Sequence, residues 1–71
     1  MTEPSVFVTI SKAAMQQYEA VRQSGDCNMV DWYCVQTVAS ERNLWDLASL
    51  TRQEYWMILS NYNALKEYHG I

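Results

Sequence analysis

The sequence predicts a mainly α-helical domain: a small bundle of three to four helices with a short N-terminal strand or extended arm. Three observations lead to this class. Apolar residues recur at spacings of three and four along most of the chain, capping residues precede these stretches, and the two glycines each follow one. Residues 1–71 suffice for a single domain. A chain of this length buries only about 60% of its surface on folding, so self-association is an expected support.

The first element is expected to be extended. Val6, Val8 and Ile10 alternate with Phe7 and Thr9, a period of two that is typical of a strand. The pattern leaves open whether the segment pairs as a strand or lies against the domain as an arm.

The first helix is expected to begin after Ser11, which is a good N-cap, and to end near Ser24. Gly25 follows as the residue best able to close it in a left-handed conformation. The inward face consists of apolar residues at spacings of four and three: Ala14, Tyr18 and Val21, with Met15 at the edge.

Three later helix starts share one pattern, a capping side chain three residues before an acid. The pairs are Asn28 with Asp31, Asn43 with Asp46, and Thr51 with Glu54. The first side chain accepts from exposed amides, and the acid reaches back while facing the positive helix end. The expected helices cover about 29–41, 44–49 and 52–68, with Gly70 after the last. The three acids are thereby explained as helix-start residues and not as a catalytic or magnesium-binding cluster.

Helical spacing divides the aromatic residues between core and surface. Three Trp and five Tyr are a high load for 71 residues, and both types are common binding anchors. Tyr18, Tyr55, Tyr62 and Trp32 are assigned to the core. The back of the helix predicted over 52–68 carries a second apolar stripe with Trp56 beside it. The candidate partner-binding residues are Tyr33, Trp45, Trp56, Met57, Ala64 and Tyr68.

Catalysis and metal binding are not expected. Cys27 and Cys34 are interpreted as reduced, buried, small apolar residues, because Cys34 falls within a helical pattern; a disulfide between them is the alternative. His69 is the only histidine, so neither a zinc ligand set nor a usual catalytic base is available. It is assigned to packing or to the helix C-terminus. We therefore predict no enzyme activity, no cofactor and no metal.

Charge and hydropathy narrow the partners further. Five basic residues against eight acids give a net charge of −3, and the basic residues are dispersed, which disfavours nucleic-acid binding. No secretory signal begins at Met1, and no apolar run approaches the roughly 20 residues of a membrane span. We expect a location in the host cytoplasm, without membrane contact.

Residues 21–31, V-R-Q-S-G-D-C-N-M-V-D, are followed by V-Q at 35–36 and alanine at 39. This stretch resembles small phage and prophage proteins of unknown function that carry an I-R-x-S-G-x-x-N-M-x-D block followed by V-Q-x-x-A. It departs from that block at Val21, in place of isoleucine, and at Val30, where an aromatic residue is usual. The resemblance implies origin in a virus or an integrated element.

The leading hypothesis is a small acidic phage-type protein that acts by protein–protein binding, most concretely as an anti-CRISPR-like inhibitor of a host protein. Its expected partner is a host or phage protein, or a second copy in a homodimer. One alternative is a ribbon–helix–helix-like DNA-binding regulator, although the outward positions of its expected strand carry no Arg or Lys. Another alternative is an accessory protein of virion assembly.

Overall fold

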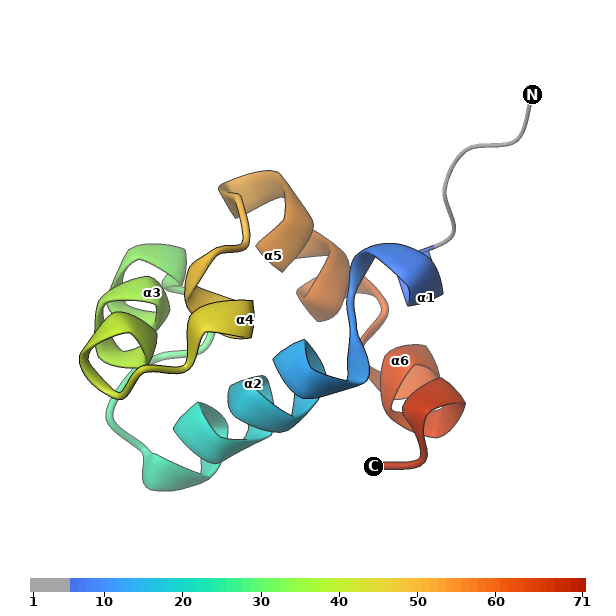
Figure 1. Ribbon diagram of the computed structural model, residues 1–71, viewed down its shortest axis with the longest axis horizontal. Helices are drawn as coiled ribbons and strands as arrows, with labels where there is room; N and C mark the ends of the chain where they lie inside the picture. Colours follow the sequence, from blue (N-terminus) through green and yellow to red (C-terminus); the bar gives the residue numbers. More distant parts are fainter. Residues whose placement is uncertain (1–5) are drawn as a thin grey trace.

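The computed structural model describes residues 6–71, and in this range it contains helices and no strand (Figure 1). The elements are α1 (Val6–Thr9), α2 (Lys12–Ser24), α3 (Trp32–Glu41), α4 (Trp45–Ala48), α5 (Arg52–Ser60) and α6 (Tyr62–His69). The mainly helical class is confirmed. At one end of the molecule α4 packs against α2 and α3, and at the other end α6 packs against α1 and α2. The Met1 region, on which the signal-peptide expectation rests, lies outside the described residues.

The N-terminal segment is helical, so the strand or extended arm expected there is wrong. The Ile10 amide donates to the Val6 carbonyl at 2.9 Å, a hydrogen bond of the helical i→i−4 type. The alternation also fails, because Ile10 is fully buried whereas Val8 is 75% exposed. α1 instead packs on α6, where Phe7 stacks on Tyr68. Within the described range no second strand is present to pair with an extended segment.

Several predicted helix boundaries are confirmed by their capping geometry. Ser11 Oγ accepts from an amide of the first turn of α2 at 3.1 Å. Thr51 and Glu54 form a reciprocal capping box at the start of α5, with N···O distances of 3.1 and 2.9 Å. Gly25 and Gly70 close α2 and α6 at φ values of 73° and 70°, in the left-handed region that strains a residue with a Cβ.

α3 begins at residue 32, later than the predicted 29, because Asp31 is its N-cap and Asn28 is not. The Asp31 carboxylate accepts from the Cys34 amide at 3.2 Å. The Asn28 side chain accepts from the Val30 amide at 3.2 Å, which is an Asx turn before the helix. The predicted reciprocal pair is therefore wrong, although both polar residues do organise the entry to α3.

The predicted Asn43–Asp46 cap of α4 is also wrong. Asn43 lies at φ 59° and ends α3, since the Leu44 amide donates back to the Ala39 carbonyl at 2.8 Å. The cap of α4 comes from α2 instead. Gln17 Oε1 accepts from the Leu47 amide at 2.9 Å, and Gln17 Nε2 donates to the Asp46 carboxylate at 3.0 Å. A tertiary contact thus replaces the local one that the sequence pattern indicated.

The single helix predicted over 52–68 is wrong, because it breaks at Asn61. The φ of Asn61 is −126°, and its side-chain Nδ2 donates to the Met57 carbonyl at 3.0 Å. A short polar side chain that bonds the carbonyls of the preceding turn competes with the helical pattern. The break lets α6 turn towards α2, and Leu65 of α6 becomes fully buried.

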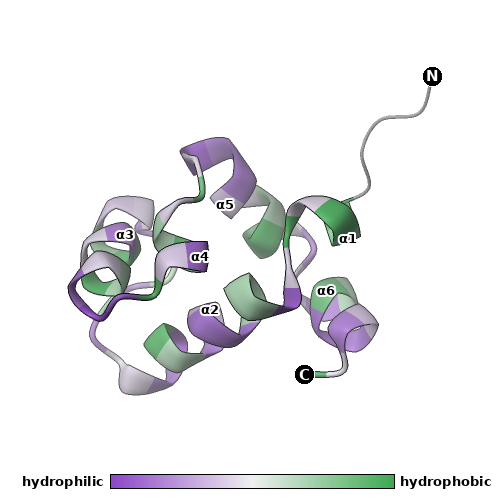
Figure 2. Cartoon of the chain, viewed as in Figure 1, coloured by the Kyte–Doolittle hydropathy of each residue, from purple (hydrophilic) through white to green (hydrophobic). Residues whose placement is uncertain are grey.

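The core draws on every helix except α1, together with the segments between them. Figure 2 shows hydrophobic and hydrophilic residues interleaved along the helices, as amphipathic packing requires. Ala14, Tyr18 and Val21 are buried as predicted, whereas Cys34 and Tyr62 are only half-buried. The apolar side chains of Val38, Leu44 and Leu59 are half-buried as well. The buried apolar residues are Ile10, Ala14, Met15, Tyr18, Val21, Val35, Ala39, Leu47, Ala48, Leu50, Tyr55, Ile58 and Leu65.

The two cysteines form a disulfide, so their interpretation as reduced, separate residues is wrong. Cys27 lies in the segment before α3, and Cys34 lies in the first turn of α3, with a Cα–Cα distance of 6.0 Å. The late start of α3 explains the difference. Because the helix begins at Trp32, the intervening chain can turn back and bring the two side chains together.

A charge cluster centred on the buried Glu19 joins α2 to α6, and the sequence pattern did not predict it. Glu19 is only 8% exposed and accepts a hydrogen bond from the Tyr62 hydroxyl. Arg22 and Lys66 lie 3.6 and 3.9 Å from its carboxylate oxygens and supply the compensating charge. Burial and the bond to Glu19 raise the pKa of Tyr62, which keeps its hydroxyl a donor.

Candidate functional site

A groove of about 300 Å³ lies between the start of α3 and the outer side of α5. We call it the α3–α5 groove. One side is formed by four consecutive residues and the other by four residues of α5. The lining residues are Val30, Asp31, Trp32 and Tyr33 on the first side, and Arg52, Tyr55, Trp56 and Leu59 on the second.

Three hydrogen bonds hold the first side of the groove in place. Asp31 caps α3, as described above, and the Trp32 Nε1 donates to the Leu50 carbonyl at 3.4 Å. The hydroxyl of Tyr55, from α5, donates to the Met29 carbonyl next to Val30. The last two bonds connect the groove wall to Leu50 and Tyr55, which are both buried in the core, so the wall is positioned by the fold.

Large apolar side chains stand exposed around this groove. Tyr33 is 74% exposed, Val30 66% and Trp56 63%. Single exposed apolar residues are ordinary, but several around one concavity are typical of an interaction site.

The groove also carries polar groups of both signs. Asp31 and Arg52 lie on opposite sides of it, so the net charge of the lining is balanced. The ring of Tyr55 is 2% exposed, and burial raises the pKa of its hydroxyl well above the ordinary value of 10. That hydroxyl therefore remains a neutral hydrogen-bond donor to Met29 at any physiological pH.

Tyr33 borders a second, more polar groove on the other side of α3. This groove has a volume of about 340 Å³ and runs along α3 beside α4. It is lined by Tyr33, Gln36, Thr37, Ser40, Glu41 and Ala48. Tyr33 therefore lines both the α3–α5 groove and this more polar groove.

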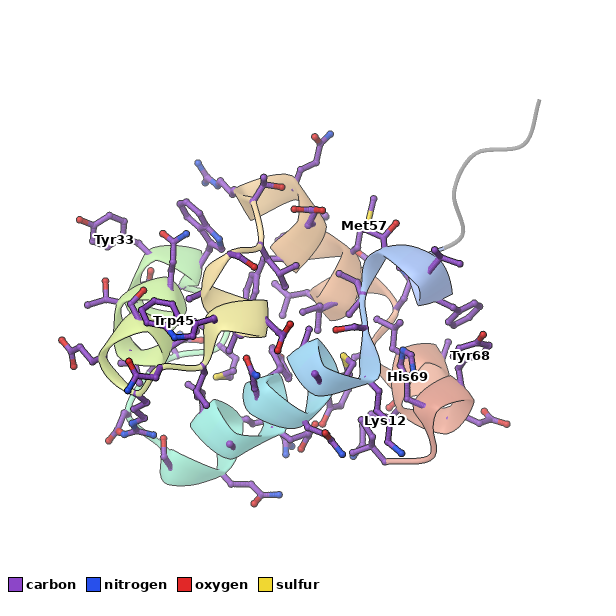
Figure 3. All side chains as sticks on the ribbon, in the orientation of Figure 1. Lys12, Tyr33, Trp45, Met57, Tyr68 and His69 are labelled. Carbon is purple, nitrogen blue, oxygen red and sulfur yellow. A yellow bond between two sulfur atoms is a disulfide. The ribbon has the colours of Figure 1, made fainter. Side chains whose placement is uncertain are left out.

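The structure brings together only two of the candidate binding residues, Tyr33 and Trp56. Trp45 is 60% exposed on α4, and Tyr68 is 62% exposed at the other end of the molecule from Tyr33 (Figure 3). Met57 is half-buried and packs against the core, whereas Ala64 is exposed on α6. The break at Asn61 separates Met57 from Ala64 and Tyr68, which were predicted to form one apolar stripe along a continuous helix over 52–68.

The predicted exposure of the aromatic residues is confirmed even though their grouping is not. Tyr33, Trp45, Trp56 and Tyr68 are all exposed, while Tyr18 and Tyr55 are buried. Trp32 and Tyr62, which were also assigned to the core, are only half-buried. Six of the eight groove residues were not among the candidates: Val30, Asp31, Trp32, Arg52, Tyr55 and Leu59. The sequence position of Val30 could have indicated its exposure. It is a large apolar residue in a turn between two capping residues, where no helical face exists on which it could be buried.

A second aromatic group lies where α1 meets α6. Phe7 and Tyr68 stack with ring centroids 4.5 Å apart, and His69 meets the Tyr68 ring edge-on at 5.0 Å. A ring nitrogen of His69 lies 2.9 Å from the Ile10 carbonyl (Figure 3 shows Tyr68 and His69 side by side). These contacts hold the two ends of the described chain together and account for His69 structurally.

No group of three or more His, Cys, Asp or Glu side chains within residues 6–71 is arranged to hold a metal ion. No helix among the described elements is long and apolar enough to cross a membrane.

Comparison with known proteins adds one family. The family model for a domain of unknown function, DUF5049, matches residues 11–59. No curated protein and no solved structure matches the chain. The matched range begins at the N-cap of α2 and contains every residue that lines the α3–α5 groove, whereas Phe7 and Tyr68 lie outside it.

Proposed function

The chain belongs to the DUF5049 family, and from this premise we propose that it is a protein-binding module that docks through the α3–α5 groove. The observation that carries the proposal is the exposure of Val30, Tyr33 and Trp56 around one concavity. Rigid aromatic side chains beside a preformed hollow are the usual anchors of protein interfaces, because they bury much area at little entropic cost. The polar groove beyond Tyr33 supplies the hydrogen-bonding rim that such an interface needs.

The partner is a protein that presents an apolar anchor within a basic surface. The chain's net charge of −3 favours approach to such a surface by long-range attraction. Glu41 lines the polar groove next to Tyr33, and Asp31 lines the apolar one, so acids lie on both sides of the expected anchor. A ribbon–helix–helix regulator gains no support, because α1 occupies the place of the strand that would read bases.

In its most concrete form, the proposed function is inhibition of a host defence protein, as in anti-CRISPR proteins. The supports are the resemblance to phage and prophage proteins, the small size, and an acidic surface with aromatic anchors. The chain acts in the host cytoplasm, on a host or phage protein.

We predict that Trp56→Ala weakens partner binding by about tenfold or more, the usual effect of losing an aromatic anchor. Trp45→Ala is a matched control, because it removes the same residue type at nearly equal exposure, 60% against 63%, but outside the groove. The partner is captured from host lysate, identified by mass spectrometry, purified, and its Kd measured by calorimetry. Equal Kd values for both variants, capture of only a second copy of the chain, or no captured partner would refute the docking proposal.

The inhibitor function has its own test in cells. Expression of the wild-type chain and of Trp45→Ala is expected to restore plaques of a targeted phage on a strain with an active CRISPR system. Trp56→Ala is expected not to restore them. If the wild-type chain leaves the plaque count unchanged, the anti-CRISPR function is rejected, while the binding measurement still decides on the docking module.

A further inference from the structure

The Cys27–Cys34 disulfide encloses one entire side of the α3–α5 groove. Val30, Asp31, Trp32 and Tyr33 all lie between the two cysteines in the sequence. The opposite side belongs to α5, which carries no cysteine. Breaking or forming this disulfide therefore acts directly on one wall of the groove and not on the wall formed by α5.

We propose that Cys27 and Cys34 form a thiol–disulfide exchange site whose redox state sets the shape of the groove. As regulation of the docking site, this inference rests on the proposed function. Both cysteines are half-buried and not enclosed in the core, so a small thiol can reach them. Accessible disulfides are the ones that exchange readily with cellular thiols.

The reaction is a pair of exchange steps with glutathione, the abundant thiol of a reducing cytoplasm. A glutathione thiolate attacks one sulfur, forms a mixed disulfide and releases the other cysteine. A second glutathione attacks the mixed disulfide and releases glutathione disulfide. The protein gains two electrons and two protons as two thiols, and two glutathione molecules are oxidised to one disulfide. The reverse exchange with glutathione disulfide closes the link again.

Noncovalent contacts would keep the reduced chain folded around the groove. Asp26 pairs with Arg42 at the far end of α3, and the Met29 carbonyl accepts from Tyr55. Both contacts lie on the same segment as Cys27, and neither depends on the disulfide. Reduction removes only the covalent restraint on residues 27–34, so this segment is expected to open more often while α2, α5 and α6 keep their packing.

The test compares amide hydrogen exchange of the oxidised chain with that of the chain reduced by a phosphine. Amides at 27–34 are expected to exchange about tenfold faster or more after reduction, because the closed loop no longer restrains the open state. Amides of α6 are expected to be unchanged. The Cys27→Ser, Cys34→Ser double variant is the control: it should exchange like the reduced chain and ignore the phosphine. A series of glutathione buffers then gives the midpoint of the transition.

Three results would overturn the switch. Unchanged exchange at 27–34 would show that the link does not control the groove wall. Loss of protection in α6 as well would show that the disulfide is a general support of the fold. A disulfide that no glutathione buffer reduces would not respond in a cytoplasm. None of these readouts uses a partner, so the switch can fail while docking stands, and docking can fail while the switch stands.

Discussion

Replacing Ile58 by Ala is expected to lower the free energy of unfolding by about 2–5 kcal/mol, the usual range for removing a large aliphatic side chain from a core. Ile58 is fully buried in α5 and belongs to the hydrophobic core. A domain of this size is stable by only about 4–10 kcal/mol, so the loss is a large share of the total. Urea unfolding followed by far-ultraviolet circular dichroism measures it. The milder Ile58→Val, at about 0.5–1.5 kcal/mol, keeps the comparison available if the alanine variant does not fold.

The matched control is Trp56→Ala, two residues before Ile58 on the same helix. Its ring is 63% exposed, so we expect a change within about 0.5 kcal/mol despite the larger volume removed. Comparable losses for Trp56→Ala and Ile58→Ala would contradict the packing described for α5. The contrast also matters for function, because a stable Trp56→Ala protein ensures that a binding defect reflects the lost anchor.

Unfolding is expected to become much easier above pH 10, through the buried tyrosines. Burial first, and then the charge of Tyr18 when that residue ionises, raise the pKa of Tyr55; burial likewise raises the pKa of Tyr18. The two rings lie 5.9 Å apart. In the unfolded chain both groups release a proton near pH 10, whereas the folded chain retains it. The stability is therefore intact below about pH 9 and falls as the pH rises through and above 10.

For Tyr55 alone the expected loss is about 1.4 kcal/mol for each pH unit between the unfolded and folded pKa values. Urea midpoints between pH 8 and 11.5 measure the slope. Tyr55→Phe removes one titrating group, so the stability of this variant is expected to fall less steeply with pH, by the contribution of one proton. The variant also loses the hydrogen bond to the Met29 carbonyl at neutral pH. Tyr33→Phe, at an exposed ring, is the control and should keep the wild-type slope. Identical slopes in all three proteins would refute the assignment.

These expectations also separate the two roles of α5. Its inner face, with Tyr55 and Ile58, holds the core, and its outer face, with Trp56, borders the groove. Because the two faces lie on one short helix, the binding affinity of any groove variant has to be compared with its free energy of unfolding. The exposed position of Trp56 makes it the more direct probe of binding.

Most of the helices and their inward faces could be predicted from the sequence. Ser11, Gly25 and the Thr51–Glu54 box each act on their own backbone or on residues three or four positions away. Such local interactions are present in the sequence as spacing, and so is the apolar period that assigned Tyr18 and Tyr55 to the core. The exposure of Tyr33, Trp45, Trp56 and Tyr68 follows from the same period.

The grouping of those exposed residues was decided by the tertiary structure. Gln17 caps α4 from a position 30 residues away from Leu47, and no local pattern records such a contact. The side chain of Asn61 breaks the last helix, which separates Tyr68 from Met57, and the late start of α3 lets Cys27 reach Cys34. In each of these three cases, backbone or side-chain groups that a regular helix or a local cap could use are bound by another partner instead. The sequence by itself determined most of the helical segments and their apolar faces. Only the packing of the helices decided which exposed residues share a groove, because that depends on contacts between residues far apart in the chain.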